Sequence, residues 1–231
     1  MSARQQSGIS LIEMMVGITV GLIVVAGASM VAVNQVSEHK RVVLETQTQQ
    51  ELRAASEIMV RELRKAGSWG SPELGVWSAR TPNPQTNPFQ AVTISDEGRQ
   101  IEFSYSNRIA VANDYGVDAA PTPDVEEERG FRLSGQQLEF RIGNGGYQPL
   151  TDPASLVITR FQNTMRSTSA PMASRCAKPC AAGSLTCPPT VTVREVRVVI
   201  EGYARHDANI RRAVDFTTRL AADQIQGSCP A

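Results

Sequence analysis

The first part of the chain is an almost unbroken apolar run that extends from Ile9 to Val33. Its stretch from Met14 to Val33 carries no formal charge. Since about 20 apolar residues cross the hydrocarbon core of a bilayer, the run predicts a membrane-spanning helix. A cleaved secretory signal fits less well, because Arg4 is the only basic residue of the leader and Glu13 interrupts the start of the run.

A second pattern begins where the apolar run ends. Asn34–Lys65 contains neither proline nor glycine, and its apolar residues recur at three- and four-residue steps with charged residues between them. Those apolar positions are Leu44, Leu52, Ala55, Met59, Leu63 and Ala66. Gly67 follows two basic residues and is a suitable helix C-cap. The pattern predicts that the helix continues over 34–67 as an amphipathic segment.

The remainder, 68–231, reads as a head built from strands. Residues 68–88 are rich in proline and predict a loop. Later segments alternate apolar and polar residues with a period of two, which predicts an antiparallel sheet with one covered face. The alternating apolar residues are Ile101, Phe103 and Tyr105; Leu138, Phe140 and Ile142; Val196, Val198 and Ile200; and Val214, Phe216 and Leu220. Further strands are predicted at 91–95 and 156–161.

Together these patterns predict an α+β fold. A long N-terminal helix, with a membrane half over 9–33 and an amphipathic half over 34–67, would pack on an antiparallel β-sheet with loop insertions. The most polar insertion is the acidic segment 107–130. Its carboxylates are the ligand type that calcium prefers, but they lack the regular spacing of a calcium loop, so a solvated loop without metal is the favoured interpretation.

The four cysteines lie near the C-terminus, at Cys176, Cys180, Cys187 and Cys229. Zinc binding by this set is disfavoured, because an exported head favours disulfides and no Cys-x2-Cys pair is present. Three disulfide pairings are possible. The segments 191–203 and 211–220 predict a hairpin that turns near residues 207–208, which would bring Cys187 opposite the neighbour of Cys229. We therefore expect the pairs Cys187–Cys229 and Cys176–Cys180.

The composition argues against two classes of function, nucleic-acid binding and catalysis. The 231 residues have a formal net charge of zero, so general affinity for nucleic acid is not indicated. The two histidines, His39 and His206, fall in the helix and in a predicted turn, and both are expected to be solvated. No catalytic constellation, phosphate loop or cofactor motif is apparent, which argues against an enzyme.

Glu13 is the anomaly of the apolar run, because a charge at the centre of a bilayer costs about 3 kcal/mol or more. Its surroundings, Gly8-Ile9-Ser10-Leu11-Ile12-Glu13, resemble the processing motif of type IV prepilins, although that family more often has phenylalanine where Ile9 stands. The resemblance implies that a prepilin peptidase removes residues 1–8 by cutting after Gly8 and methylates the new amine of Ile9. It also implies that Glu13 meets the Ile9 amine of a neighbouring subunit during assembly. An opposite charge at close range favours the ionised form of both groups.

The end of the predicted helix, Arg61-Glu62-Leu63-Arg64-Lys65-Ala66-Gly67, resembles that of PilW-type minor pilins. This resemblance implies a subunit that is anchored in the bacterial inner membrane with a periplasmic head and later joins the pilus at or near its tip. The partners it implies are prepilin peptidase, other minor pilins, the major pilin and a large tip adhesin.

Two alternatives remain open at this point. A J-type minor pseudopilin of type II secretion has a similar helix and size. A tip module for adhesion or DNA uptake would use the loops at 107–130 and 167–189.

Overall fold

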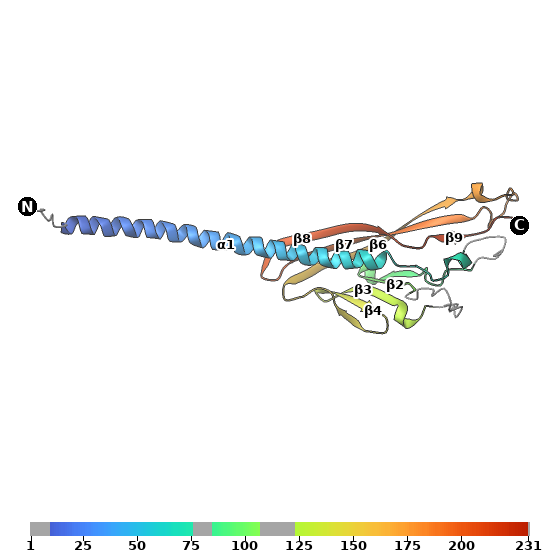
Figure 1. The fold of residues 1–231 in the computed structure, drawn as a ribbon, viewed down its shortest axis with the longest axis horizontal. Coiled ribbons are helices and arrows are strands. Elements are labelled where there is room, and N and C mark those ends of the chain that lie inside the picture. The colour runs from blue at the N-terminus through green and yellow to red at the C-terminus, as the bar shows by residue number, and fades with distance from the viewer. Residues whose placement is uncertain (1–9, 76–84, 107–122, 231) are drawn as a thin grey trace, which may run out of the picture. The chain divides into compact units, whose positions relative to one another are not determined.

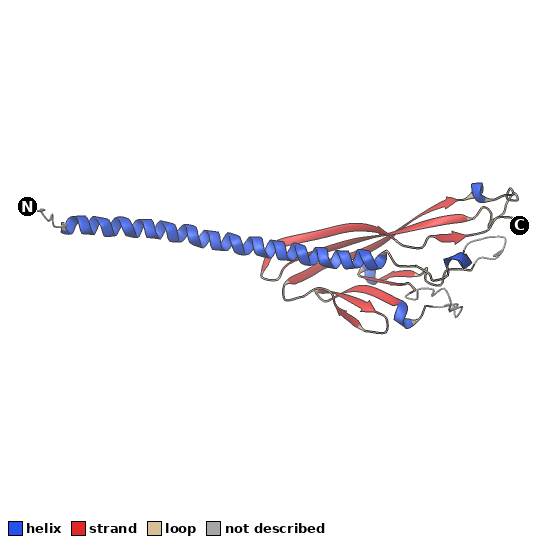
Figure 2. Ribbon diagram, in the orientation of Figure 1, coloured by secondary structure: helices blue, strands red, loops and turns tan. Residues whose placement is uncertain are grey.

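The computed structural model describes residues 10–75, 85–106 and 123–230 of the chain. They form an α+β architecture with one long helix and antiparallel strands (Figures 1 and 2). Contacts divide the chain into two units, Met1–Thr46 and Gln47–Ala231. The helix α1 (Leu11–Leu63) begins in the first unit and ends in the second.

The end of α1 follows the predicted C-cap. Beyond Leu63 the amides form tighter i→i+3 bonds, so that Ala66 N donates to Leu63 O at 3.1 Å and Ser68 N donates to Lys65 O at 2.9 Å. Gly67 then adopts a φ of +83°, a left-handed conformation that a residue with a Cβ rarely accepts. The glycine therefore stops the helix where the sequence predicts.

Five antiparallel strands form the first sheet, in the order β1-β2-β3-β4-β5. Their bounds are β1 Val92–Ser95, β2 Gln100–Ser104, β3 Glu128–Ser134, β4 Gln137–Ile142 and β5 Tyr147–Pro149. In register, Ile101 faces Phe131, which in turn faces Phe140 on the next strand. These side chains point to one face, and the rings of Phe131 and Phe140 stack with centroids 4.5 Å apart.

The second sheet consists of longer strands in the order β6-β7-β8, with β9 paired to β7. Their bounds are β6 Leu156–Pro171, β7 Thr190–Ala204, β8 Asp207–Arg219 and β9 Gln224–Gln226. All pairings are antiparallel, and Val198 faces both Asn163 of β6 and Phe216 of β8. Short 3-10 turns connect several elements: η1 Pro72–Gly75, η2 Asp96–Gly98, η3 Val125–Glu127 and η4 Ala173–Arg175.

The core of the head lies between α1 and the two sheets. One cluster of buried side chains joins the C-terminal part of α1 to both sheets. Its fully buried members include Leu52, Met59 and Leu63 of α1, Ile101, Phe131 and Leu138 of the first sheet, and Phe161, Val196 and Ile200 of the second. Figure 1 shows this part of α1 running beside the strands of both sheets.

Several strand predictions need correction. The head contains two sheets, because β6 packs beside the first sheet instead of extending it. The strand predicted at 156–161 continues to Pro171, and β3 lies where part of the acidic insertion 107–130 was predicted as loop. The β7–β8 turn is at residues 205–206 instead of near 207–208. Val198 pairs with Phe216, so the observed pairing of the two strands differs from the predicted register by one residue.

The predicted disulfides are wrong. The structure pairs Cys176 with Cys229 and Cys180 with Cys187, at Cα–Cα distances of 5.2 and 5.5 Å, so neither Cys187–Cys229 nor Cys176–Cys180 forms.

The physical reason is that the β7 ladder stops at Thr190, after two prolines that have no N–H to donate. The chain opposite this end of β7 is β9, and it turns at Gly227, whose φ is +88°. Ser228 N then donates to Thr186 O at 2.9 Å, and Cys229 continues to Cys176 instead of facing Cys187.

Candidate functional site: the exposed helix and its attachment to the head

The N-terminal part of α1 exposes an apolar surface that the chain itself does not cover. From Leu11 to Val43 its large hydrophobic side chains are between 55% and 76% exposed. Of the described residues, only α1 is long and apolar enough to cross a membrane. A contiguous apolar surface of this kind marks contact with lipid or with another protein.

Polar side chains within this surface are satisfied by the helix itself. Thr19 Oγ1 donates to Met15 O at 2.7 Å, and Ser29 Oγ donates to Val25 O at 2.8 Å. In an apolar solvent these internal bonds avoid the cost of an unpaired hydroxyl. Between Leu11 and Val33 the surface is therefore compatible with lipid at every position except one.

That position is Glu13, in the first turn of α1. It is the only charged residue between Ser10 and Val33, and its side chain is exposed. A helix N-terminus favours a carboxylate by a fraction of a kcal/mol, which is much less than the cost of placing a charge in hydrocarbon. Across the part of the chain that the structure describes, no basic side chain pairs with it. Gly8 and Ile9, the predicted processing site, lie outside the described residues.

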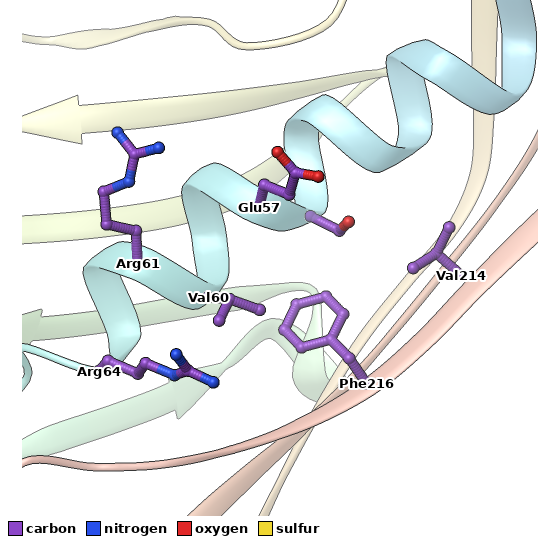
Figure 3. A pocket seen from close by; sticks show the side chains of 7 residues that line it. Glu57, Val60, Arg61, Arg64, Val214 and Phe216 are labelled. Carbon is purple, nitrogen blue, oxygen red and sulfur yellow. The ribbon is translucent and has the colours of Figure 1, made fainter.

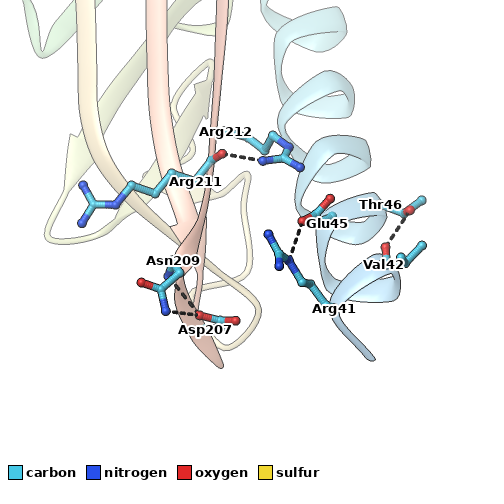
Figure 4. A network of polar contacts seen from close by, with 8 residues as sticks. All are labelled: Arg41, Val42, Glu45, Thr46, Asp207, Asn209, Arg211 and Arg212. Carbon is cyan, nitrogen blue, oxygen red and sulfur yellow. Dashed lines mark hydrogen bonds and ion pairs between the residues drawn. The ribbon is translucent and has the colours of Figure 1, made fainter. Parts of the chain in front are cut away.

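Charged pairs appear on α1 where the apolar surface ends. Arg41 Nε lies 3.2 Å from Glu45 Oε1, one helical turn away (Figure 4). His39 is exposed on the same segment, as predicted, and His206 is exposed in the β7–β8 turn. In the first residues of β8, Asn209 donates to Asp207 Oδ1 from both its backbone and its side chain, at 3.0 Å (Figure 4).

A polar cluster attaches the end of α1 to the first sheet. Tyr105 is 7% exposed, and its hydroxyl donates to Glu62 Oε2 at 2.6 Å while it accepts from Arg129 Nε at 3.2 Å. Lys65 Nζ lies 2.7 Å from Glu62 Oε1 and 5.2 Å above the Tyr105 ring. Burial and the bond to Glu62 raise the pKa of Tyr105 above its ordinary value. The cluster keeps each buried polar group paired, which fixes the helix end on the sheet.

A second attachment involves Arg194 of β7, which is 5% exposed. Its guanidinium donates to the carbonyl oxygens of Gln90 and Ala222, the latter at 3.3 Å. Burial lowers the pKa of this guanidinium, and the Asp223 carboxylate opposes the shift. Ala221 N also donates to Ala66 O at 3.1 Å. The helix end, the segment before β1 and the segment after β8 are thus held together.

A shallow groove runs between α1 and β8 (Figure 3). Its volume is about 430 Å³, and Val60 of α1 and Phe216 of β8 supply its apolar floor. Arg61 and Arg64 stand at its rim, together with Glu57. These are surface charges on an open groove, and they form no catalytic arrangement.

The cysteines and acidic residues that could have bound a metal have structural roles instead. The sulfurs of Cys176, Cys180 and Cys187 lie within 4.8 Å of one another, but all four cysteines are in disulfides, so no thiolate is left for zinc. Of the described acidic residues, Glu126 and Glu127 lie in the 3-10 turn η3, where Glu127 Oε2 accepts from the backbone N of the N-cap residue Asp124. Most of the acidic segment 107–130, which the sequence predicts to be a solvated loop, falls at residues 107–122 and lies outside the described residues.

Two sequence families match the chain. Residues 3–29 match the prokaryotic N-terminal methylation motif, which covers Gly8, Ile9 and Glu13. Residues 41–220, more than half of the chain, match the family described as prepilin peptidase-dependent protein B. The chain belongs to this prepilin peptidase-dependent family. Comparison with curated proteins and with solved structures gives no match.

Membership assigns the chain to the type IV minor pilin-like proteins, which are structural proteins and not enzymes. The family name and the motif together imply dependence on prepilin peptidase. The exposed apolar helix fits the membrane-anchored state of a pilin. The polar attachments at Tyr105 and Arg194 were not identified from the sequence, because their partners come from segments that are distant along the chain.

Proposed function

We propose that this protein is a PilW-like minor pilin that helps to initiate type IV pilus assembly and takes a place at or near the filament tip. The observation that carries the proposal is that Glu13 is the one charged residue on the exposed apolar segment Leu11–Val33. Under this proposal the chain consists of a leader over 1–8, a membrane and filament-core helix over 9–33, an amphipathic continuation of the helix over 34–67 and a periplasmic head over 68–231.

The proposed assembly step depends on how the Glu13 carboxylate is solvated before and after assembly. In the inner membrane Glu13 lies at one end of an apolar helix, where a charge is costly. Removal of residues 1–8 frees the amine of Ile9, four residues away, which prepilin peptidase then methylates. In a growing bundle that amine can pair with Glu13 of a neighbouring subunit, which offsets the desolvation of both groups. Other minor pilins and the major pilin are the partners, and a large tip adhesin is a further one.

Replacement of Glu13 tests this step. E13A should be cleaved and methylated as the wild type is, but its amount in sheared pili should fall about tenfold, which corresponds to about 1.4 kcal/mol of lost pairing. E38A removes an exposed carboxylate from the same helix outside the apolar segment and serves as the control. Processing is read by mass spectrometry of the mature N-terminus. Wild-type incorporation of E13A would contradict the pairing.

Deletion of the gene distinguishes a role of the protein in a pilus from a role in a secretion system. A minor pilin predicts loss of surface pili and twitching, with secretion of exoproteins intact. A J-type pseudopilin of type II secretion predicts the reverse, and that result would overturn the proposal. A tip module for adhesion or DNA uptake predicts that removal of residues 107–122, the part of the 107–130 segment that precedes η3 and β3, leaves pili in place and abolishes binding.

A further inference from the structure

A cavity of about 460 Å³ lies in the head, beyond the end of α1. Three chain segments line it: residues 67–75, residues 85–90 and residues 221–225. We name it the Trp69 cavity. Its volume is in the range of small-molecule sites, which are typically about 300–1,000 Å³.

Two of the residues that line the Trp69 cavity, Trp69 and Asp223, each carry a buried polar atom that has no partner. The indole Nε1 of Trp69 is a donor, and Oδ1 of Asp223 is an acceptor, and neither makes a hydrogen bond to the described part of the chain. The other carboxylate oxygen of Asp223 accepts from Arg219 Nη2 at 2.6 Å. A buried polar group without a partner costs about 1–3 kcal/mol, so one donor and one acceptor in the same cavity indicate a guest that supplies both.

The lining defines the chemistry of that guest. Apart from Asp223, the polar lining is neutral, with amides at Gln85, Asn87, Gln90 and Gln224. None of the lining residues is lysine or arginine, which disfavours an anion, and Arg219 neutralises the single carboxylate, which disfavours a cation. A hydroxyl can accept from an indole N–H and donate to a carboxylate. The set therefore suits a neutral, hydroxyl-rich molecule beside an aromatic ring.

The walls are held in place before any guest arrives. Asn87 Nδ2 donates to Gly67 O at 2.7 Å, which joins the helix end to the second segment. Gln85 N donates to Leu74 O at 2.8 Å, and Arg194 bonds the carbonyls of Gln90 and Ala222. A preformed site avoids the cost of ordering its walls on binding.

We propose that the Trp69 cavity is a carbohydrate-binding site, with the Trp69 indole as donor and the Asp223 carboxylate as acceptor to sugar hydroxyls. This site is independent of the assembly step at Glu13. Its wall comes from three segments that the fold brings together beyond the end of α1.

The test uses the full chain in lipid nanodiscs, because detergents with sugar headgroups would compete. 5-Fluorotryptophan is incorporated into a W77F variant, so that Trp69 carries the only fluorine label. Trp77 lies outside the described residues. Methyl β-galactoside, N-acetylglucosamine and cellobiose are titrated, with ethanolamine and inorganic phosphate as charged comparisons. At least one sugar should shift the Trp69 resonance saturably, with a dissociation constant of about 1 mM or below.

Variants decide whether the shift reports this cavity. D223N should weaken sugar binding about tenfold, and D215N, which removes an exposed carboxylate paired with Arg197 on the outer surface, should leave it unchanged. W69F, followed by calorimetry, loses the donor and gives a second measure if D223N proves unstable. No saturable shift with any sugar means that water alone fills the cavity, which overturns the proposal. Saturation by ethanolamine or phosphate instead of sugar overturns the ligand class.

Discussion

At the scale of single residues, the Tyr105 hydroxyl lies between a carboxylate and a guanidinium. It donates to Glu62 and accepts from Arg129, and these two bonds make α1 and the first sheet interdependent. Deprotonation would remove the donor and place a negative charge beside the Glu62 carboxylate. The folded state therefore holds the Tyr105 proton more tightly than the unfolded chain does, which is the direction of the raised pKa.

This difference predicts how stability depends on pH. Because the folded pKa of Tyr105 is above the unfolded value of about 10, its contribution is fully present below pH 10 and is lost as pH rises through the folded pKa. Y105F should make the free energy of unfolding lower than that of the wild type at neutral pH and reduce its fall at alkaline pH. The measurement is denaturant unfolding at a series of pH values.

Tyr147, whose pKa is also raised, accounts for a remaining alkaline dependence. Y147F is accordingly the matched variant, and the double variant should be the least sensitive to alkaline pH. An alkaline slope identical in Y105F and the wild type would show that the Tyr105 cluster does not titrate with folding.

Some residue-scale features were predictable from the sequence and others were not. Glu13 was recognisable because a single charge in an apolar run violates the local pattern. Arg194 gave no such signal, since its carbonyl partners belong to Gln90 and Ala222, which are remote along the chain. The Trp69 cavity was hidden for the same reason, because three separate segments form its wall. A sequence pattern reveals a residue that departs from its immediate neighbours, such as Glu13. Arg194 and the Trp69 cavity depend instead on tertiary contacts between distant segments.

At the scale of elements, the second half of α1 is attached by one buried stripe. Leu52, Met59 and Leu63 are each 0% exposed, and they occupy the positions that the three- and four-residue spacing predicts. The C-terminal stop at Gly67 also follows from local chemistry. The helix was predictable because its period, cap and buried face all agree.

Truncation within this stripe should weaken the head. L52A is expected to lower the free energy of unfolding by about 2–5 kcal/mol, because the lost transfer energy and the cavity add. Q50A changes an exposed position on the same helix and should remain within about 0.5 kcal/mol of the wild type. Urea unfolding, monitored by circular dichroism, gives both values. Equal losses in the two variants would contradict the assigned face.

Strands were predicted less completely than the helix. The inward residues of β7 are even-numbered from Arg194 to Ala204, and the apolar alternation of Val196, Val198 and Ile200 made this strand evident. β3 was missed because its sequence is dominated by Glu128, Arg129, Gly130 and Arg132. Arg129 is buried there with hydrogen bonds to Tyr105 and to the carbonyls of Glu126 and Glu128. The separation into two sheets depends on which strand edges meet, which alternation does not encode.

At the scale of the whole head, the two disulfides differ in the size of the loops they close. Cys176–Cys229 joins residues 53 apart, and Cys180–Cys187 joins residues 7 apart. From loop entropy alone, the first should stabilise by about 4 kcal/mol and the second by about 2 kcal/mol. C176S/C229S should therefore unfold at a lower denaturant concentration than C180S/C187S.

Mapping of non-reduced peptides gives an independent check of the pairing. It should recover Cys229 linked to Cys176 in the wild type and in C180S/C187S. A Cys187–Cys229 peptide, or equal loss of stability in the two double variants, would contradict the pairing in the structure.

The Cys176–Cys229 bond also matters when the chain is pulled. The segment it encloses contains β7, β8 and β9, so tension applied between the anchor helix and the C-terminus would pass through the sulfurs and leave that segment without load. At about 3.4 Å per residue, roughly 180 Å of backbone is unavailable for extension. In the oxidised protein, such tension therefore stretches the chain by far less than its full contour length, and the strands inside the loop keep their pairing under force.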